Sequence, residues 1–147
     1  MVDRFVSKAL TLPSRDQYFA RADLVFYDLD HSVPTYEGRI FLGAKRGLKH
    51  GAGIEEPSYA GSYFTFGDDR CHGDVGHCEV PTERDPFDLR FAHHLTPGAT
   101  AVTVTDRLRQ LIEEGNEEAK VTVLAYGSDL EPIEGLSFTR LRLLTYA

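Results

Sequence analysis

Apolar and polar residues alternate in several segments of the chain, as they do along half-buried β-strands. From Ala22 onward, Leu24 and Phe26 alternate with polar or smaller residues, and Ile40 and Leu42 share one face of the next segment. Together with the β-prone residues of the other segments, this alternation predicts strands at residues 22–29, 36–42, 59–66, 87–94, 101–105, 120–126 and 136–146. We therefore expect strands to dominate the fold.

One segment, residues 106–114, has the periodicity of an amphipathic helix. Thr105 can cap its first turn, Asp106 favours that turn through the helix dipole, and Gly115 ends the helix. The apolar stripe of this helix consists of Leu108, Leu111 and Ile112. A single short α-helix among strands predicts a mainly β fold, an antiparallel β-sandwich or barrel of about six or seven strands.

Residues 21–147 are interpreted as a single β-sandwich domain, and residues 1–20 as an N-terminal arm or short helix that precedes it. Two long loops that contain glycines, residues 43–58 and 67–88, connect predicted strands, and the second loop holds both cysteines. Long loops without regular structure in a compact domain are usually functional or held in place by something. The second loop is therefore the expected position of a functional site.

The composition limits the classes of function. Of the 147 residues, 41% are apolar, which is enough for a folded core and argues against disorder. The formal net charge of −7 argues against nucleic acid or an anionic membrane surface as a partner. The apolar runs fall short of the roughly 20 residues of a membrane span, and we recognise no signal-peptide pattern, so we expect a cytoplasmic protein.

The candidate chemistry lies between Cys71 and Cys78, where the intervening glycines let a short loop fold back on itself. Thiolate and imidazole ligands suit copper, with zinc and iron as alternatives. His93 and His94 could add a ligand from the end of the predicted strand at residues 87–94, where adjacent side chains point to opposite faces. The candidate metal ligands are therefore Cys71, His72, His77, Cys78, His93 and His94.

Two other interpretations of the cysteines stay open. A disulfide between Cys71 and Cys78 would close a small loop and stabilise the protein by about 2–3 kcal/mol. The two residues could also be unrelated reduced thiols beside solvated histidines. Since the spacing differs from that of zinc fingers, in which paired cysteines lie two to four residues apart, the sequence leaves all three interpretations in place.

Five segments form an ordered set within residues 22–146: 36–42, 59–64, 71–78, 104–114 and 120–138. Together they resemble the C-terminal domain of polyphenol oxidases and related tyrosinase-family proteins, in which a strand reading Ala-Gly-Ser-Phe is similar to Tyr-Ala-Gly-Ser-Tyr-Phe here. The resemblance implies a β-sandwich that packs over or beside a type 3 copper domain. It does not imply the copper centre, which needs three histidines per copper on a helical bundle, whereas the six histidines here lie in predicted loops and strand ends.

Two functions of different classes follow from these observations. In the first, the chain is a non-catalytic companion that associates with a tyrosinase-like catalytic domain or subunit, covers its copper site and holds or delivers copper through the Cys/His loop. In the second, it is a small stand-alone metalloenzyme with a mononuclear Cys/His site that acts on a small substrate, of which a phenol is one candidate. The first function requires an exposed apolar patch, and the second requires a cleft with an open ligand position beside the metal. A homo-oligomer also remains open.

Overall fold

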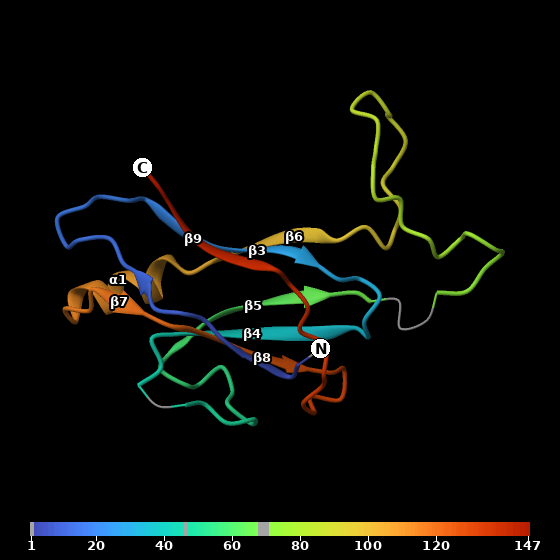
Figure 1. Ribbon diagram of the computed structural model, residues 1–147. Helices are drawn as coiled ribbons and strands as arrows, with labels where there is room; N and C mark the ends of the chain where they lie inside the picture. Colours follow the sequence, from blue (N-terminus) through green and yellow to red (C-terminus); the bar gives the residue numbers. More distant parts are fainter. Residues whose placement is uncertain (1, 46, 68–70) are drawn as a thin grey trace.

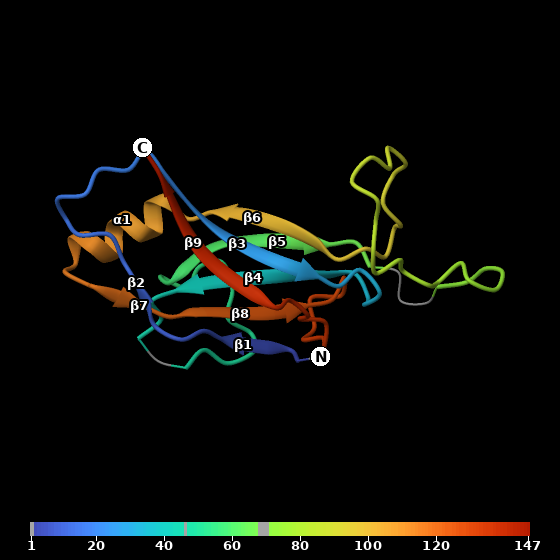
Figure 2. The same cartoon turned by 45° about the horizontal axis from the view of Figure 1, so that its top comes forward.

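The computed structural model describes residues 2–45, 47–67 and 71–147, and within them the chain forms nine β-strands and one α-helix. The elements are β1 (Arg4–Val6), β2 (Leu10–Thr11), β3 (Arg21–Leu29), β4 (Tyr36–Leu42), β5 (Tyr59–Thr65), β6 (Gly98–Thr103), α1 (Thr105–Glu113), β7 (Glu118–Ala119), β8 (Val121–Tyr126) and β9 (Arg140–Tyr146). Two antiparallel sheets, in the orders β1-β8-β4-β5 and β6-β3-β9, face each other as a sandwich (Figures 1 and 2). A short β2–β7 ladder lies beside α1. The predicted mainly β sandwich with one short helix is confirmed.

The main core lies between the two sheets. Leu24 and Phe26 of β3 face Ile40 of β4 and Val123 of β8, and all four side chains are fully buried in one cluster. Each such side chain contributes roughly 1.5–3 kcal/mol when it leaves water. The alternation along β3 and β4 that predicts these strands is therefore the alternation that builds the core.

The outer face of the larger sheet is covered as well, by the β4–β5 connection. We call the residues there the outer cluster; its members are Phe41, Leu124 and Tyr126 of the sheet with Leu48, Ala52 and Tyr59 packed against them. Because β8 is covered on both faces, each of its residues from Val121 to Tyr126 is buried. The loop that contains Leu48 and Ala52 thus packs on the sheet.

The helix α1 docks through Leu108, Leu111 and Ile112, the stripe that the sequence predicts. Gly115 ends it with φ +87°, a left-handed conformation that glycine adopts at little cost. The predicted cap is wrong, because the Thr105 hydroxyl instead accepts a hydrogen bond from the Ala22 amide at 3.0 Å and no side chain caps the helix. Among the described residues, no helix is both long and apolar enough to cross a membrane.

Three sequence predictions of secondary structure are corrected. The short-helix alternative for residues 1–20 is wrong, because β1 pairs with β8 and β2 pairs with β7. The strand predicted at residues 87–94 is also wrong, because that stretch forms no β-ladder. The last strand is shorter than predicted and begins at Arg140.

Two tyrosines from the neighbouring strands β4 and β5 pack in the core between the sheets. The hydroxyls of Tyr36 and Tyr63 lie 3.2 Å apart, and the Tyr63 ring packs on Phe26. Gly38 makes room for this ring, since a Cβ at that position would lie 2.4 Å from it. Burial raises the pKa of both tyrosines, because the protein interior disfavours a phenolate.

Candidate metal centre

The connection between β5 and β6 leaves the sandwich as a long projection, the yellow-green segment in Figures 1 and 2. Its described residues, 66–67 and 71–97, contain neither helix nor strand, and turns recur along the second range. The His77 amide donates to the Asp74 carbonyl at 3.0 Å, and the Glu79 amide donates to the Gly76 carbonyl at 3.2 Å. The predicted candidate ligands all lie on this projection.

A disulfide joins Cys71 to Cys78, whose Cα atoms lie 5.7 Å apart. Both glycines between them are needed locally. Gly76 has φ +88°, and a Cβ on Gly73 would lie 2.4 Å from the His77 ring. The loop therefore folds back as predicted, and of the three interpretations of the cysteines the structure has the disulfide.

Three imidazoles of the projection lie close together. The rings of His93 and His94 stack with centroids 4.4 Å apart, and His77 lies 5.4 Å from His94. His93 Nδ1 accepts a hydrogen bond from the Leu95 amide at 3.1 Å, so its Nε2 carries the proton and donates to the His77 carbonyl at 2.6 Å. The prediction that His93 and His94 point to opposite faces is wrong, because there is no strand to separate them.

Three of the six predicted ligands come together. Cys71, His77 and His94 each place one ligand atom within 4.8 Å of the others. Cys78 is held beside them by its bond to Cys71, while His72 is an exposed residue of the same loop that lies outside the group. A disulfide sulfur lacks the negative charge of the thiolate that binds metals. The oxidised loop therefore offers imidazole ligands, and only the reduced loop adds sulfur.

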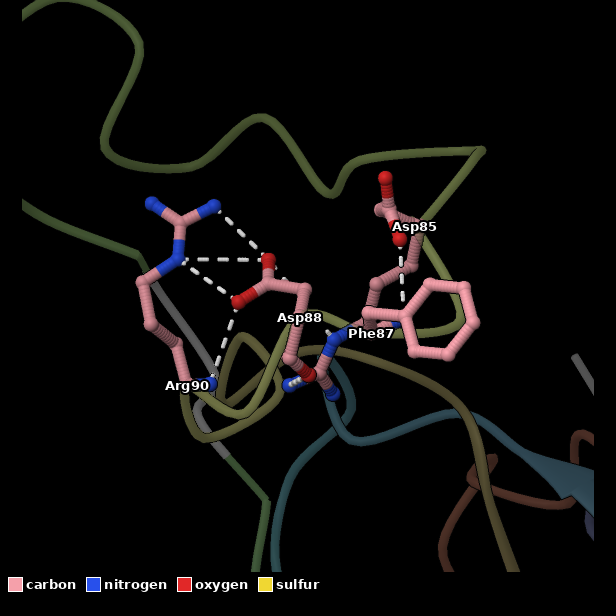
Figure 3. Close-up of polar contacts among 5 residues, drawn as sticks. Asp85, Phe87, Asp88 and Arg90 are labelled. Atoms are coloured by element: carbon pink, nitrogen blue, oxygen red, sulfur yellow. Dashed lines mark hydrogen bonds and ion pairs between the residues drawn. The ribbon is translucent and has the colours of Figure 1, made fainter.

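A charged cluster further along the projection was missed by the sequence analysis (Figure 3). The Arg90 guanidinium donates to both carboxylate oxygens of Asp88 at 2.7–3.2 Å, and Arg84 donates to the Asp88 carbonyl at 3.0 Å. The bonds from the Arg90 guanidinium, and then the bond from the Arg90 amide, hold the pKa of the Asp88 carboxyl below its usual range. Asp85 accepts the Phe87 amide at 2.8 Å. Short-range polar contacts thus give the segment a defined shape.

Large apolar side chains project from the same segment. Phe87, Leu89 and Phe91 are 89%, 97% and 103% exposed, and we call these three residues the apolar strip. They alternate with Asp88 and Arg90, a pattern that is typical of a half-buried strand. The sequence signal for a buried face is therefore real, but the described residues provide nothing that buries it.

Comparison with solved structures places this fold among known proteins. Latent aurone synthase (polyphenol oxidase) from its natural source matches with a TM-score of 0.56 and 15% identity over 98% of this chain. The recombinantly expressed latent enzyme matches with a TM-score of 0.57 and 16% identity, again over 98% of this chain. This chain shares its fold with part of a polyphenol oxidase.

The shared fold confirms the structural side of the resemblance seen in the sequence. The chain spans 24% of the length of the polyphenol oxidases that it matches. Neither a protein-family model nor a curated protein matches the sequence. At this level of identity the likeness describes the fold, and the activity of those enzymes does not transfer with it.

Proposed function

We propose that the chain is a non-catalytic companion domain that associates with a tyrosinase-like copper oxidase and covers its copper site. The observation that carries the proposal is the shared fold, which accounts for nearly the whole chain but for 24% of a polyphenol oxidase. A domain of this kind needs a catalytic partner, in the same chain or in another. The expected partner is therefore a tyrosinase-like catalytic domain or subunit.

The apolar strip supplies the contact surface that such a companion needs. Burying an exposed Phe or Leu side chain contributes roughly 1.5–3 kcal/mol, so the three residues together could anchor an interface. The bonds of Asp88 to Arg84 and Arg90 hold the segment before it meets a partner. Such preorganisation lowers the ordering cost of binding.

The Cys/His loop is the proposed carrier of copper for that partner, with zinc and iron as alternatives. The donor set fits, because thiolate and imidazole are the ligands that copper and zinc take from proteins. The proposed cytoplasmic location would supply the reducing surroundings in which Cys71 and Cys78 are thiols. Copper held here would be mononuclear and rich in sulfur, unlike a type 3 pair.

The stand-alone metalloenzyme is the weaker alternative. It requires a cleft with an open ligand position beside the metal. The hollow next to the histidines, of about 460 Å³, is lined by His93 but not by His77 or His94. Both ring nitrogens of His93 are engaged in hydrogen bonds. The geometry around the histidines thus supports a companion more than a catalyst.

The experiment is to mix the purified chain with the tyrosinase-like copper oxidase of the same organism. We expect the two to elute together from a gel-filtration column, and the diphenol oxidation rate of the oxidase to fall. Replacing all three residues of the apolar strip by serine should abolish both effects. The chain alone, given copper and a diphenol, should form no quinone.

The matched control replaces two exposed apolar residues elsewhere, Tyr18 and Ile54, which are 78% and 67% exposed. Serine at these positions should leave the association intact. Equal losses from both sets of changes would contradict the assignment of the strip. The chain could instead associate with itself. If the strip variant abolishes that self-association, the chain is a homo-oligomer and the proposed partner is wrong.

A further inference from the structure

We infer that the Cys71–Cys78 disulfide and a metal ion compete for the same sulfur atoms. In the reduced chain, Cys71, His77, Cys78 and His94 bind a thiophilic ion, and in the oxidised chain the ion is released. The inference rests on the metal-binding part of the proposed function and adds its regulation. It makes the projection a redox-controlled metal site.

The first argument is distance. The ligand atoms of Cys71, His77 and His94 already lie within 4.8 Å of one another. Tetrahedral zinc, with bonds of about 2.0–2.3 Å, needs its ligand atoms about 3.3–3.8 Å apart. The imidazoles of His77 and His94 are exposed and lie on the projection, outside the buried core, so a metal can bind them without repacking the core.

The second argument is the sulfur. In the oxidised chain Cys71 is bonded to Cys78, and neither sulfur can act as a thiolate. Opening that bond leaves two thiols next to two imidazoles. Two cysteines and two histidines form the common closed set of a structural zinc site. The same residues therefore change from a poor donor set to a complete one.

The hydrogen bonds of His93 exclude it from the proposed ligand set. Both ring nitrogens of His93 are used within the loop, one by the Leu95 amide and the other by the His77 carbonyl. His93 is thus a neighbour that holds the His77 backbone, while His94 stacks on its face. His72 is exposed and lies outside the three-residue group. The site therefore uses four of the six candidate residues.

The chemistry of the switch balances. A dithiol reductant gives two hydrogens to the disulfide and closes to its own disulfide, which leaves two cysteine thiols. Each thiol then releases one proton to water as its sulfur bonds to the metal. Oxidation reverses the sequence, and the re-formed disulfide releases the ion.

The test is a titration of the full chain with Zn²⁺ alone, before and after reduction by a phosphine. The phosphine takes the oxygen of one water molecule, whose two hydrogens go to the sulfurs, and a thiol assay confirms the state. We expect reduction to tighten the apparent Kd for Zn²⁺ by a factor of about 100 or more, since thiolate ligands and metal affinity are linked. Co²⁺ in place of Zn²⁺ should give a thiolate-to-cobalt absorption band in the reduced chain only.

Single variants then identify the ligands. His77→Ala and His94→Ala should each weaken Zn²⁺ binding by the reduced chain, by roughly 10-fold or more. The control His72→Ala, in the same loop, should bind like the wild type. Circular dichroism and thermal unfolding verify that each variant keeps its fold.

The outcomes separate the two levels of the proposal. Tight binding in the oxidised and reduced states alike would overturn the redox control but keep the metal carrier. Weak binding in both states would overturn the metal carrier and, with it, the switch. If the reduced His77→Ala and His94→Ala variants bind Zn²⁺ as tightly as the reduced wild type, the assignment of these two ligands is wrong.

Discussion

The two long connections, one between β4 and β5 and the other between β5 and β6, differ in how they contact the sandwich. The β4–β5 connection lies on the sheet, where Leu48 and Ala52 pack against the outer cluster. The Tyr126 hydroxyl accepts from the Gly51 amide at 3.0 Å and donates to the Ala52 carbonyl at 3.2 Å. The β5–β6 connection instead projects from the sandwich (Figures 1 and 2) and turns Phe87 outward.

This difference distinguishes a connection that packs on the sheet from one that is available to bind a partner. Both connections contain glycines and apolar residues, yet they differ in where these side chains lie. In the first, Leu48 and Ala52 pack on the sheet, whereas the second leaves the apolar strip exposed. The second is held by its own local crosslinks, the Cys71–Cys78 disulfide and the Asp88–Arg90 ion pair. A segment that is ordered before binding, with its apolar side chains still exposed, loses less conformational entropy when it binds a partner. The free energy of unfolding should therefore depend more on the contacts of the first connection, and partner binding on the second connection.

The largest expected effect tests the first connection. Tyr126→Ala should lower the free energy of unfolding by about 3–5 kcal/mol, because it empties a buried ring position in the outer cluster. Tyr126→Phe keeps the ring and removes only the hydroxyl bonds, so it should cost about 1–2 kcal/mol. Urea denaturation measures both values. A loss below 1 kcal/mol for Tyr126→Ala would mean that the connection is not part of the folded body.

The next effect tests the crosslink of the projection. In the oxidised protein, Cys71→Ser should lower the free energy of unfolding by about 2–3 kcal/mol, the entropic contribution of a short closed loop. Cys78→Ser and the double variant should give the same value, because all three remove one shared bond. Denaturant melts of the three variants check this. Additive losses would show that the two cysteines act independently.

A smaller effect on stability is expected in the apolar strip. Serine at Phe87, Leu89 and Phe91 together should change the free energy of unfolding by no more than about 1 kcal/mol, since exposed positions tolerate substitution. The same variant should lose its oxidase partner. Measuring both quantities on one preparation sharpens the contrast with Tyr126→Ala. If the strip variant lost as much free energy of unfolding as Tyr126→Ala, the proposed difference between the two connections would be wrong.

The smallest effect concerns the charged cluster. The pKa of Asp88 is lowered in the folded chain, so its ion pair contributes above the unfolded-state pKa of about 3.9 and is lost as pH falls through the lowered value. The contacts to Arg90 should thus persist from neutral pH down to about pH 4. An NMR titration of the Asp88 carboxyl carbon and the Arg90 amide measures this, with Asp88→Asn as the control. An Asp88 carboxyl that titrates at its ordinary value would contradict the ion pair.

Much of the fold could be predicted from the sequence because the period-two pattern is satisfied inside the chain. Leu24, Phe26 and Ile40 alternate in the sequence and are buried in the structure. The strand at residues 87–94 fails for the complementary reason, since its apolar face has no surface to pack on within the described residues. The first strands were missed because β1 and β2 are too short, at three and two residues, to establish a pattern.

The candidate site was predictable in composition but not in arrangement. Cysteine and histidine density points to the loop, but which side chains meet depends on how the projection folds back. That return path brings His94 to Cys71, across more than twenty positions of sequence without regular structure. Whether the cysteines bond to each other depends on the redox environment, which the sequence does not encode.

The tyrosine pair in the core gives the protein an optical reporter. The chain has seven tyrosines and no tryptophan, so its near-ultraviolet absorbance comes mainly from phenol rings. Burial raises the pKa of Tyr36 and Tyr63, so both rings resist ionisation while the sheets stay closed over them. After a jump to strongly alkaline pH, the delayed part of the absorbance rise would therefore time the opening of the sandwich, with no dye or label attached.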